Sequence, residues 1–231
     1  MNITILFDLD GTLLDTLDDL ADSVNFALES SGLPRRSLDE IRSFVGNGIK
    51  NLVHRAVPDG CDAEAEGEIF SLFKQHYAIN CAVKTAPYPD IEALLGRLKA
   101  EGYMLGVVSN KNDTNVKKLI NAYFPGVFDV ICGERENVRR KPAPDLVLAC
   151  MEELGCGKSE TVYVGDSDVD SLTAANAGIK CILVSWGFRD RSYLKEKCAD
   201  PIVDSVAELH ESISECFALS KTSNNRNSQN I

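Results

Sequence analysis

The chain has 231 residues, of which 44% are hydrophobic and 26% are charged, which is typical of a folded protein with a substantial core. It carries 24 Lys and Arg residues against 35 Asp and Glu residues, a net charge of −11. This balance argues against a general nucleic-acid or anionic-membrane surface, because both require a basic face. An anionic ligand would therefore need a local cation.

The first predicted element is a strand over residues 3–8, which delivers two carboxylates, Asp8 and Asp10, followed by Gly11 and Thr12. Side chains alternate along a strand, so Asp8 and Asp10 project to the same side. Two carboxylates so close repel one another unless a cation joins them. The stretch therefore predicts a site for a positively charged group.

An insertion over residues 16–82 follows, with helical periodicity and no convincing strand. We expect helices over 15–32, 37–46, 48–57 and 62–79, the second of them beginning with a capping box from Ser37 to Glu40. An insertion of this size predicts a separate all-helical domain.

Apolar, β-branched runs at 104–110, 128–133, 161–166, 180–186 and 201–204 alternate with helical patterns over 90–102, 113–124 and 143–155. Fully apolar strands that alternate with helices predict an α/β core, a doubly wound (Rossmann-like) parallel sheet covered on both faces. The core is expected to comprise residues 1–15 and 83–218. Residues 219–231 are polar and aperiodic, and we expect a disordered tail.

The eight cysteines are scattered, without a CxxC pair. We see no signal peptide and no apolar stretch long enough to cross a bilayer. Together these features predict reduced thiols in a cytoplasmic protein that has no membrane partner.

Ligands of an open parallel sheet bind beyond the carboxyl ends of its strands. In this chain those ends are followed by Asp8, Asp10 and Thr12, by Ser109, Asn110 and Lys111, by a loop that reaches Lys141, and by Asp166 and Asp170. The carboxylates Asp8, Asp10, Asp166 and Asp170 suit Mg²⁺, which takes oxygen ligands and keeps sites for water and phosphate. The combination predicts a Mg²⁺ site at the sheet edge.

Three other motifs fail on their spacing. Calcium loops that start at Asp8 or Asp166 lack the required Gly and Glu. The stretch 157–159 resembles a P-loop, but Glu152 stands where that loop needs its first glycine. Residues 46–48 begin like a dinucleotide fingerprint, but no strand precedes them.

The order of these strand ends resembles the haloacid dehalogenase superfamily of phosphohydrolases along nearly the whole chain. The four family motifs match Asp8-Leu-Asp10-Gly-Thr12, Ser109-Asn110, Lys141-Pro142 and Gly165-Asp166-Ser-Asp-Val-Asp170. The helical insertion is similar to the family's type-1 cap. Within the family, the stretches DLDGTLLDT, FVGNGIKNLVHRA and RKPAPD are typical of phosphoglycolate phosphatase-like enzymes.

The resemblance implies a role for each of these residues. Asp8 would be a nucleophile that forms an aspartyl phosphate, and Asp10 a general acid and base. Lys141 would be the cation beside the nucleophile. Ser109, the Asn110 amide and Thr12 would bind the phosphoryl oxygens. The metal would lie on Asp8, the Asp10 carbonyl and Asp166, with Asp170 in its outer shell.

The cap would close over this site and select the leaving group. Gly46, Asn47 and Gly48 would form a loop that faces the core. Lys50, Arg55 or His54 would pair with a carboxylate on the substrate, although a solvated helix face explains the same residues. These cap residues complete the predicted substrate-binding set.

The expected function is Mg²⁺-dependent hydrolysis of a small phosphorylated metabolite, with phosphoglycolate phosphatase as the first choice. An inorganic pyrophosphatase or a sugar-phosphate phosphatase is the alternative, and a phosphomutase or an inactive interaction protein on the same fold is less favoured. Dehalogenation is disfavoured because it has no use for Asp10. The chain is expected to act as a monomer or homodimer.

Overall fold

The computed structural model describes residues 3–46 and 48–227, with side chains through residue 218, and contains the predicted doubly wound α/β core. Its six-stranded sheet has the order β5-β4-β1-β6-β7-β8, and every neighbouring pair is parallel. The strands are β1 (Thr4–Phe7), β4 (Met104–Asn112), β5 (Val130–Glu134), β6 (Thr161–Gly165), β7 (Lys180–Val184) and β8 (Ile202–Val203). Their apolar, β-branched sequences fit strands that are buried on both sides.

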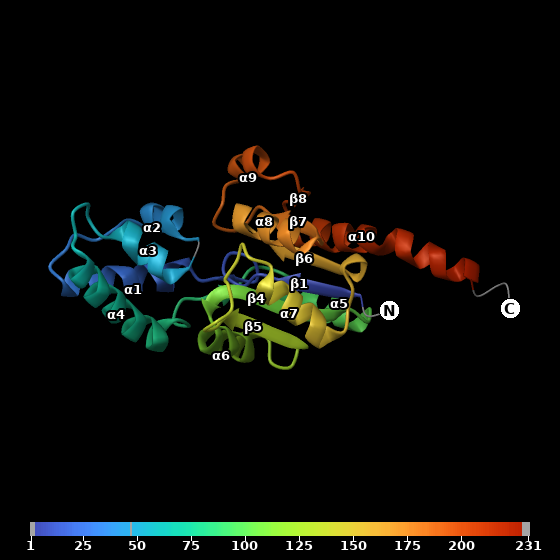
Figure 1. Cartoon of the computed structure of the whole chain (residues 1–231), viewed down its shortest axis with the longest axis horizontal. Helices are drawn as coiled ribbons and strands as arrows, with labels where there is room; N and C mark the ends of the chain where they lie inside the picture. The colour runs from blue at the N-terminus through green and yellow to red at the C-terminus, as the bar shows by residue number, and fades with distance from the viewer. Residues whose placement is uncertain (1–2, 47, 228–231) are drawn as a thin grey trace.

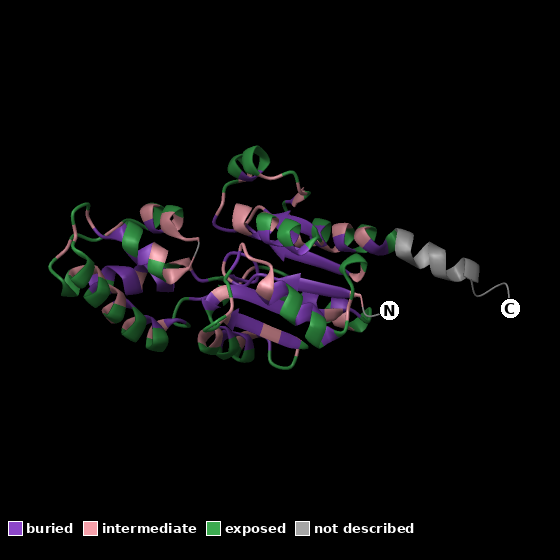
Figure 2. Cartoon of the chain, in the orientation of Figure 1, coloured by how far each residue is buried: buried purple, intermediate pink, exposed green. Residues whose placement is uncertain are grey.

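Two layers of helices enclose the sheet (Figures 1 and 2). Because side chains alternate along β1, Ile5 and Phe7 belong to one apolar cluster and Leu6 to another. The first cluster includes residues of α5 (Ile91–Ala100), α6 (Asp113–Tyr123) and α10 (Val206–Asn227). The second includes residues of α7 (Asp145–Leu154), α8 (Asp168–Ala177) and α9 (Arg191–Lys197). A short 3₁₀ helix, η1 (Lys158–Glu160), precedes β6.

The insertion after β1 is helical, as expected, and lies at one end of the sheet domain (Figure 1). It consists of α1 (Leu17–Ser30), α2 (Leu38–Phe44), α3 (Ile49–Ala56) and α4 (Ala63–Asn80). The predicted capping box is present, because Ser37 Oγ accepts from the Glu40 amide and Glu40 accepts from the Ser37 amide. We call this segment the cap.

The cap is joined to the core at the point where the chain leaves and re-enters the core. The strands β2 (Leu14–Asp15) and β3 (Ala86–Pro87) form an antiparallel pair where the chain leaves and re-enters the core. Asp19 of α1 is 2% exposed, and its carboxylate accepts from the backbone amides of Val83, Lys84 and Thr85. A buried carboxylate satisfied by several amides fixes the returning chain against α1.

The expected disordered tail, residues 219–231, overlaps the end of the last helix. Helix α10 continues to Asn227, while residues 228–231 lie outside the described part. The helix is anchored by Leu209, Ile213 and Phe217, which are buried at four-residue spacing. Once these turns are fixed, each further residue adds one helical hydrogen bond, so the helix extends into a polar sequence.

Two further predictions concern the cysteines and the membrane. All eight cysteines are free thiols. Within residues 3–46 and 48–227, no helix is long and apolar enough to cross a membrane.

Candidate active site

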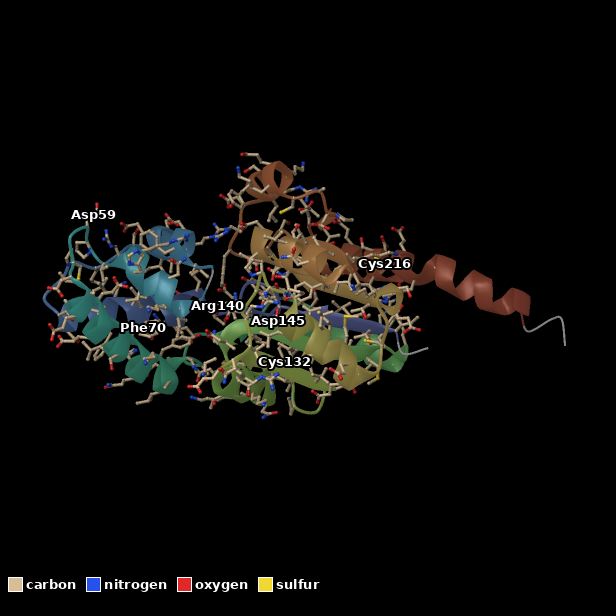
Figure 3. All side chains as sticks on the ribbon, viewed as in Figure 1. Asp59, Phe70, Cys132, Arg140, Asp145 and Cys216 are labelled. Atoms are coloured by element: carbon tan, nitrogen blue, oxygen red, sulfur yellow. The ribbon has the colours of Figure 1, made fainter. Side chains whose placement is uncertain are left out.

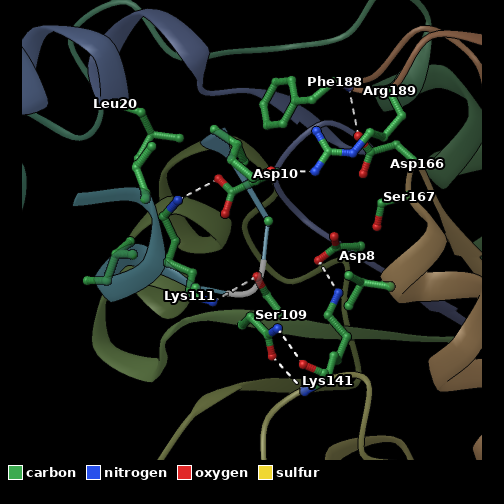
Figure 4. Close-up of a pocket in the computed structure, with 17 residues that line it drawn as sticks. Asp8, Asp10, Leu20, Ser109, Lys111, Lys141, Asp166, Ser167, Phe188 and Arg189 are labelled. Carbon is green, nitrogen blue, oxygen red and sulfur yellow. Dashed lines mark hydrogen bonds and ion pairs between the residues drawn. The ribbon is translucent and has the colours of Figure 1, made fainter. Parts of the chain in front are cut away.

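The register of three neighbouring strands brings the predicted motifs together at one sheet edge. Phe7, the last residue of β1, is level with Val107 of β4 and with Val164 of β6. The chain beyond these positions therefore places Asp8, Ser109 and Asp166 beside one another. All three line a cleft between the sheet edge and the cap (Figure 4).

Lys141 lies between two carboxylates at the floor of this cleft. Its Nζ atom is 2.8 Å from Asp8 Oδ1 and 2.8 Å from Asp170 Oδ1. It also donates to the Tyr163 hydroxyl at 3.0 Å. Because the Lys141 side chain is only 3% exposed, its charge is held close to Asp8 with little screening by solvent.

Asn110 positions Lys141 through a reciprocal pair of hydrogen bonds (Figure 4). The Asn110 Nδ2 group donates to the Lys141 carbonyl at 2.9 Å, and the Lys141 amide donates to Asn110 Oδ1 at 2.8 Å. The side chain of Asn110 thus fixes the loop that carries the lysine. Its neighbour Ser109 is 2% exposed and its Oγ atom accepts from the Lys111 amide at 3.2 Å.

Asp166 is buried directly after β6, and the backbone at Gly11 and at Gly187 packs closely against it. Phe188 donates its amide to Asp166 Oδ2 at 2.8 Å. A Cβ atom on Gly11, whose φ is +83°, would lie 2.4 Å from Asp166 Oδ2, and one on Gly187 would lie 2.3 Å from Asp166 Cβ. Only glycine lets these two backbone segments approach the carboxylate so closely.

Asp170 is fully buried, and both of its carboxylate oxygens are used. Oδ1 accepts from Lys141, whereas Oδ2 accepts from the amides of Asp166 and Ser167. This arrangement fits a residue that orients Lys141 and the Asp166 loop, and its expected outer-shell position stays a prediction.

The acidic group at the cleft floor has the chemistry of a divalent cation site. Oxygen atoms of Asp8, Asp166 and Asp170 lie within 4.8 Å of one another, and all three residues are buried. Lys141 supplies one positive charge for these three carboxyl groups, so full ionisation of the cluster calls for a further cation. Buried carboxylates in excess of their partners fit a hard cation such as Mg²⁺.

Burial shifts the ionisation of these groups. It raises the pKa of Asp8 from 3.8 to about 7, against the opposing effect of Lys141. Burial also raises the pKa of Asp166 well above its usual value, and the charge on Asp170 adds to this shift. For Lys141, burial favours a lower pKa, but Asp170 and Asp8 outweigh it and raise the pKa well above its usual value. Perturbed ionisation of this kind is common where catalytic groups are clustered.

Asp10 points toward a different cation from the one that faces Asp8. Its Oδ1 atom accepts from the Thr16 hydroxyl at 2.7 Å and lies 2.5 Å from Lys111 Nζ (Figure 4). The two acids of the first motif, Asp8 and Asp10, therefore have separate lysine partners. Each carboxylate thus has its own positive partner, which offsets the repulsion expected between Asp8 and Asp10.

The cap supplies an apolar wall to the cleft. The lining residues from this side include Leu20, Val45, Ile49 and Leu52. Arg189, from the loop after β7, ties this wall to the core, because its guanidinium donates to the carbonyls of Arg42 and Val45. The cleft is thus closed on one side by aliphatic groups.

The structure places some of the cap residues expected to contact substrate at the cleft and others away from it. Gly46 and Gly48 line the cleft. Their α-carbons lie beside the guanidinium groups of Arg189 and Arg140, the latter at the cap–core boundary (Figure 3). Asn47 lies outside the described residues.

Lys50, Arg55 and His54 are not among the described residues that line the cleft. Arg55 donates to the Phe44 carbonyl, and His54 pairs with Glu66 on the outer surface. Lys50 lines a separate depression beside α4.

Thr12 is 1% exposed, and its hydroxyl has no hydrogen-bond partner among the described residues. It is not one of the residues that line the cleft. Its expected contact with the phosphoryl group stays a prediction.

Several residues that line the cleft have no role in the sequence prediction, among them Lys111, Phe188 and Arg189. The sequence places Lys111 at its strand end beside Ser109 and Asn110 but assigns it no role. Phe188 and Arg189 follow β7, so extending the survey of strand ends by one strand would have revealed them.

Comparison with known sequences gives one family and many close relatives. The haloacid dehalogenase-like hydrolase family matches residues 5–184. A phosphoglycolate phosphatase of Aquifex aeolicus is 36% identical over 185 residues, which cover 80% of this chain and 85% of the relative. A phosphoglycolate phosphatase of Chromobacterium violaceum is 37% identical over 212 residues, which cover 90% of this chain and 94% of the relative.

Comparison with solved structures gives a consistent result. A candidate phosphoglycolate phosphatase from Lactobacillus delbrueckii superimposes with a TM-score of 0.87 at 35% identity, and the match covers 92% of this chain and 99% of the other. The similarity thus extends over both the core and the cap.

Proposed function

The chain belongs to the haloacid dehalogenase-like hydrolase family, and from this premise we propose that it is a Mg²⁺-dependent phosphatase whose substrate is 2-phosphoglycolate. The observation that carries the proposal is the buried Asp8, held 2.8 Å from Lys141 and grouped with Asp166 and Asp170. This is a nucleophile, a cation and a metal-binding group in one cleft.

Asp8 would attack phosphorus and form an aspartyl phosphate, which divides one displacement into two easier ones. Asp10 would protonate the departing oxygen and then accept a proton from the water that attacks the intermediate. The two-residue spacing of Asp8 and Asp10 supports this division of roles, and the two carboxylates pair with different lysines.

Stabilisation of the transferring phosphoryl group would come from several fixed donors. Lys141 lies beside the nucleophile, and Ser109, the Asn110 amide and Thr12 are the proposed partners of the phosphoryl oxygens. Asp8, the Asp10 carbonyl and Asp166 would hold Mg²⁺, with Asp170 in the outer shell. When bound, Mg²⁺ supplies positive charge that offsets the charge on the phosphoryl oxygens.

The shape of the cleft supports a small substrate without sugar hydroxyls. The cap-side wall contains Leu20, Ile49 and Leu52, whose side chains offer no hydrogen-bonding groups. A polyhydroxylated leaving group placed there would lose its hydrogen bonds to water without replacing them. The names of the relatives from Aquifex aeolicus and Chromobacterium violaceum point to the same substrate.

A phosphate-release screen with Mg²⁺ tests this proposal. The substrates would be 2-phosphoglycolate, pyrophosphate and a hexose monophosphate, each measured with and without a chelator. We expect the highest kcat/KM for 2-phosphoglycolate and no release without metal. A higher kcat/KM for pyrophosphate or the sugar phosphate would overturn the substrate, and no release from any ester would overturn the phosphatase.

A further inference from the structure

Lys111 is a buried cation inside the proposed active site that the catalytic roles above do not use. It belongs to β4, its side chain is 3% exposed, and it lines the same cleft as Asp8 and Lys141. Its Nζ atom lies 2.5 Å from Asp10 Oδ1 and 5.0 Å from the centre of the Tyr77 ring, which comes from helix α4 of the cap. Lys111 therefore connects Asp10 to the cap.

The other two described cations of the cleft are already engaged. Lys141 lies between Asp8 and Asp170, each at 2.8 Å. Arg189 donates to two carbonyls of the cap and so serves to join the cap to the core. Among the described ion pairs, Lys111 has Asp10 as its carboxylate partner.

The bond between Lys111 and Asp10 restricts the role proposed for Asp10. The Asp10 Oδ1 atom is held by both Thr16 and Lys111, so this oxygen can reach the leaving group only if Asp10 turns away from Lys111. When Asp10 turns to the leaving group, Lys111 loses its counterion in a buried position. An uncompensated buried charge is strongly unfavourable.

Tyr77 cannot supply the missing negative charge. Its side chain is 1% exposed, and burial raises the pKa of its phenol, so the ring contacts Lys111 as a neutral group. The remaining cap-side lining near the cleft is aliphatic. A second anionic group on the substrate would provide the charge that Asp10 gives up.

We propose that Lys111 binds the carboxylate of the substrate in exchange for Asp10, and that it is the residue that selects a phosphate ester bearing a second anion. This inference rests on the proposed function and adds the residue that determines specificity. The exchange couples recognition to catalysis, because only a substrate with an anionic end frees Asp10 without leaving Lys111 unpaired. An ester with a neutral end would leave Asp10 bound to Lys111.

The test compares two esters of similar length, 2-phosphoglycolate and 2-hydroxyethyl phosphate, which differ at the carboxylate. Steady-state kcat/KM would be measured with saturating Mg²⁺ for the wild type, Lys111→Gln and Lys111→Arg. Lys117→Gln serves as the matched control, because Lys117 is half exposed and pairs with Asp113 on the surface of α6. Melting temperatures would be recorded for all four proteins.

We expect the wild type to prefer 2-phosphoglycolate, and Lys111→Gln to reduce that preference by about 10- to 100-fold, the range for a hydrogen bond to a charged group. Lys111→Arg is expected to retain the preference because it keeps the charge, and Lys117→Gln should match the wild type. If Lys111→Gln does not fold, the test relies on Lys111→Arg. A loss of the preference for 2-phosphoglycolate in Lys111→Arg would then overturn the inference.

Two outcomes separate this inference from the proposed function. If the wild type prefers 2-phosphoglycolate and Lys111→Gln loses activity equally on both esters, Lys111 acts only through Asp10 or the phosphoryl group, and the inference is overturned alone. An unchanged preference for 2-phosphoglycolate in Lys111→Gln would also overturn this inference alone. If the wild type itself does not prefer 2-phosphoglycolate, the proposed substrate fails as well.

Discussion

Lys141 and Asp8 form a buried ion pair at the floor of the cleft, with Nζ 2.8 Å from Oδ1. The lysine reaches this position from the loop before α7, whereas the aspartate follows β1, and the Asn110 side chain holds the backbone of Lys141 in place. The proposed nucleophile and the cation proposed to stabilise the reaction are thus already paired in the protein alone.

Removing the Lys141 ammonium should nearly abolish catalysis. Loss of one donor to a transition-state charge costs about 3–4 kcal/mol, so we expect Lys141→Ala to lower kcat by about 10²- to 10³-fold. Phosphate release from 2-phosphoglycolate measures the change, and circular dichroism checks the fold. Lys99→Ala is the control, because Lys99 pairs with Asp129 and neither residue is among the described residues that line the cleft. Near wild-type turnover in Lys141→Ala would disprove the role.

The effect of Asp10→Asn should depend on the leaving group. General acid catalysis contributes about 10²- to 10⁴-fold, so we expect a loss of that size on 2-phosphoglycolate, whose leaving oxygen needs a proton. With p-nitrophenyl phosphate, whose leaving group departs without a proton, the loss should be smaller. Equal losses on both esters would argue that Asp10 does not protonate the leaving group.

The pKa of Asp8 predicts a pH dependence of stability. Burial raises this pKa from 3.8 to about 7, so the folded, metal-free protein binds more protons at Asp8 than the unfolded chain does. The contribution of Asp8 to stability must then fall as the pH rises from about 4 to about 7. Asp8→Asn removes this contribution.

Melting temperatures of the two metal-free proteins, recorded in chelator, test this dependence. As the pH rises across that range, the melting temperature of Asp8→Asn should increase relative to that of the wild type. Mg²⁺ should raise the wild-type melting temperature more at pH 7 than at pH 5. A difference that stays flat or shrinks as the pH rises would contradict the prediction.

Gly187 should be intolerant of any side chain. A Cβ atom there would lie 2.3 Å from Asp166 Cβ and 2.4 Å from the Gly11 carbonyl oxygen, so Gly187→Ala must displace the proposed metal ligand. We expect at least a ~10-fold higher Mg²⁺ concentration for half-maximal activity. Gly96→Ala is the control, because a Cβ atom at Gly96 in α5 has no neighbour within 4 Å, and this change should slightly stabilise the helix. Equal Mg²⁺ requirements in the two variants would refute the account of Gly187.

The sequence predicted the fold because its strongest signals are local. The apolar run before Asp8, the Ser37–Glu40 capping box and the alternation of strands with helices each appear in the structure at the expected place. Asp8, Ser109 and Asp166 could also be grouped in advance, since parallel strands end at a common edge.

Other features depend on tertiary contacts that no local pattern records. Helix spacing placed Lys50 and His54 on one face, but it could not reveal that the cleft wall is made by Leu20, Ile49 and Leu52. Likewise, the contact of Lys111 with Asp10 joins residues that are 101 positions apart. Such contacts emerge only when distant parts of the chain are packed together.

The most direct test of the central claim is hydrolysis of 2-phosphoglycolate with Mg²⁺ by the wild type and by Asp8→Asn, measured side by side as phosphate release. The account predicts turnover by the wild type that requires Mg²⁺, and none above background by a folded Asp8→Asn variant. Retention of activity in Asp8→Asn, or a wild type inactive toward 2-phosphoglycolate, would contradict it.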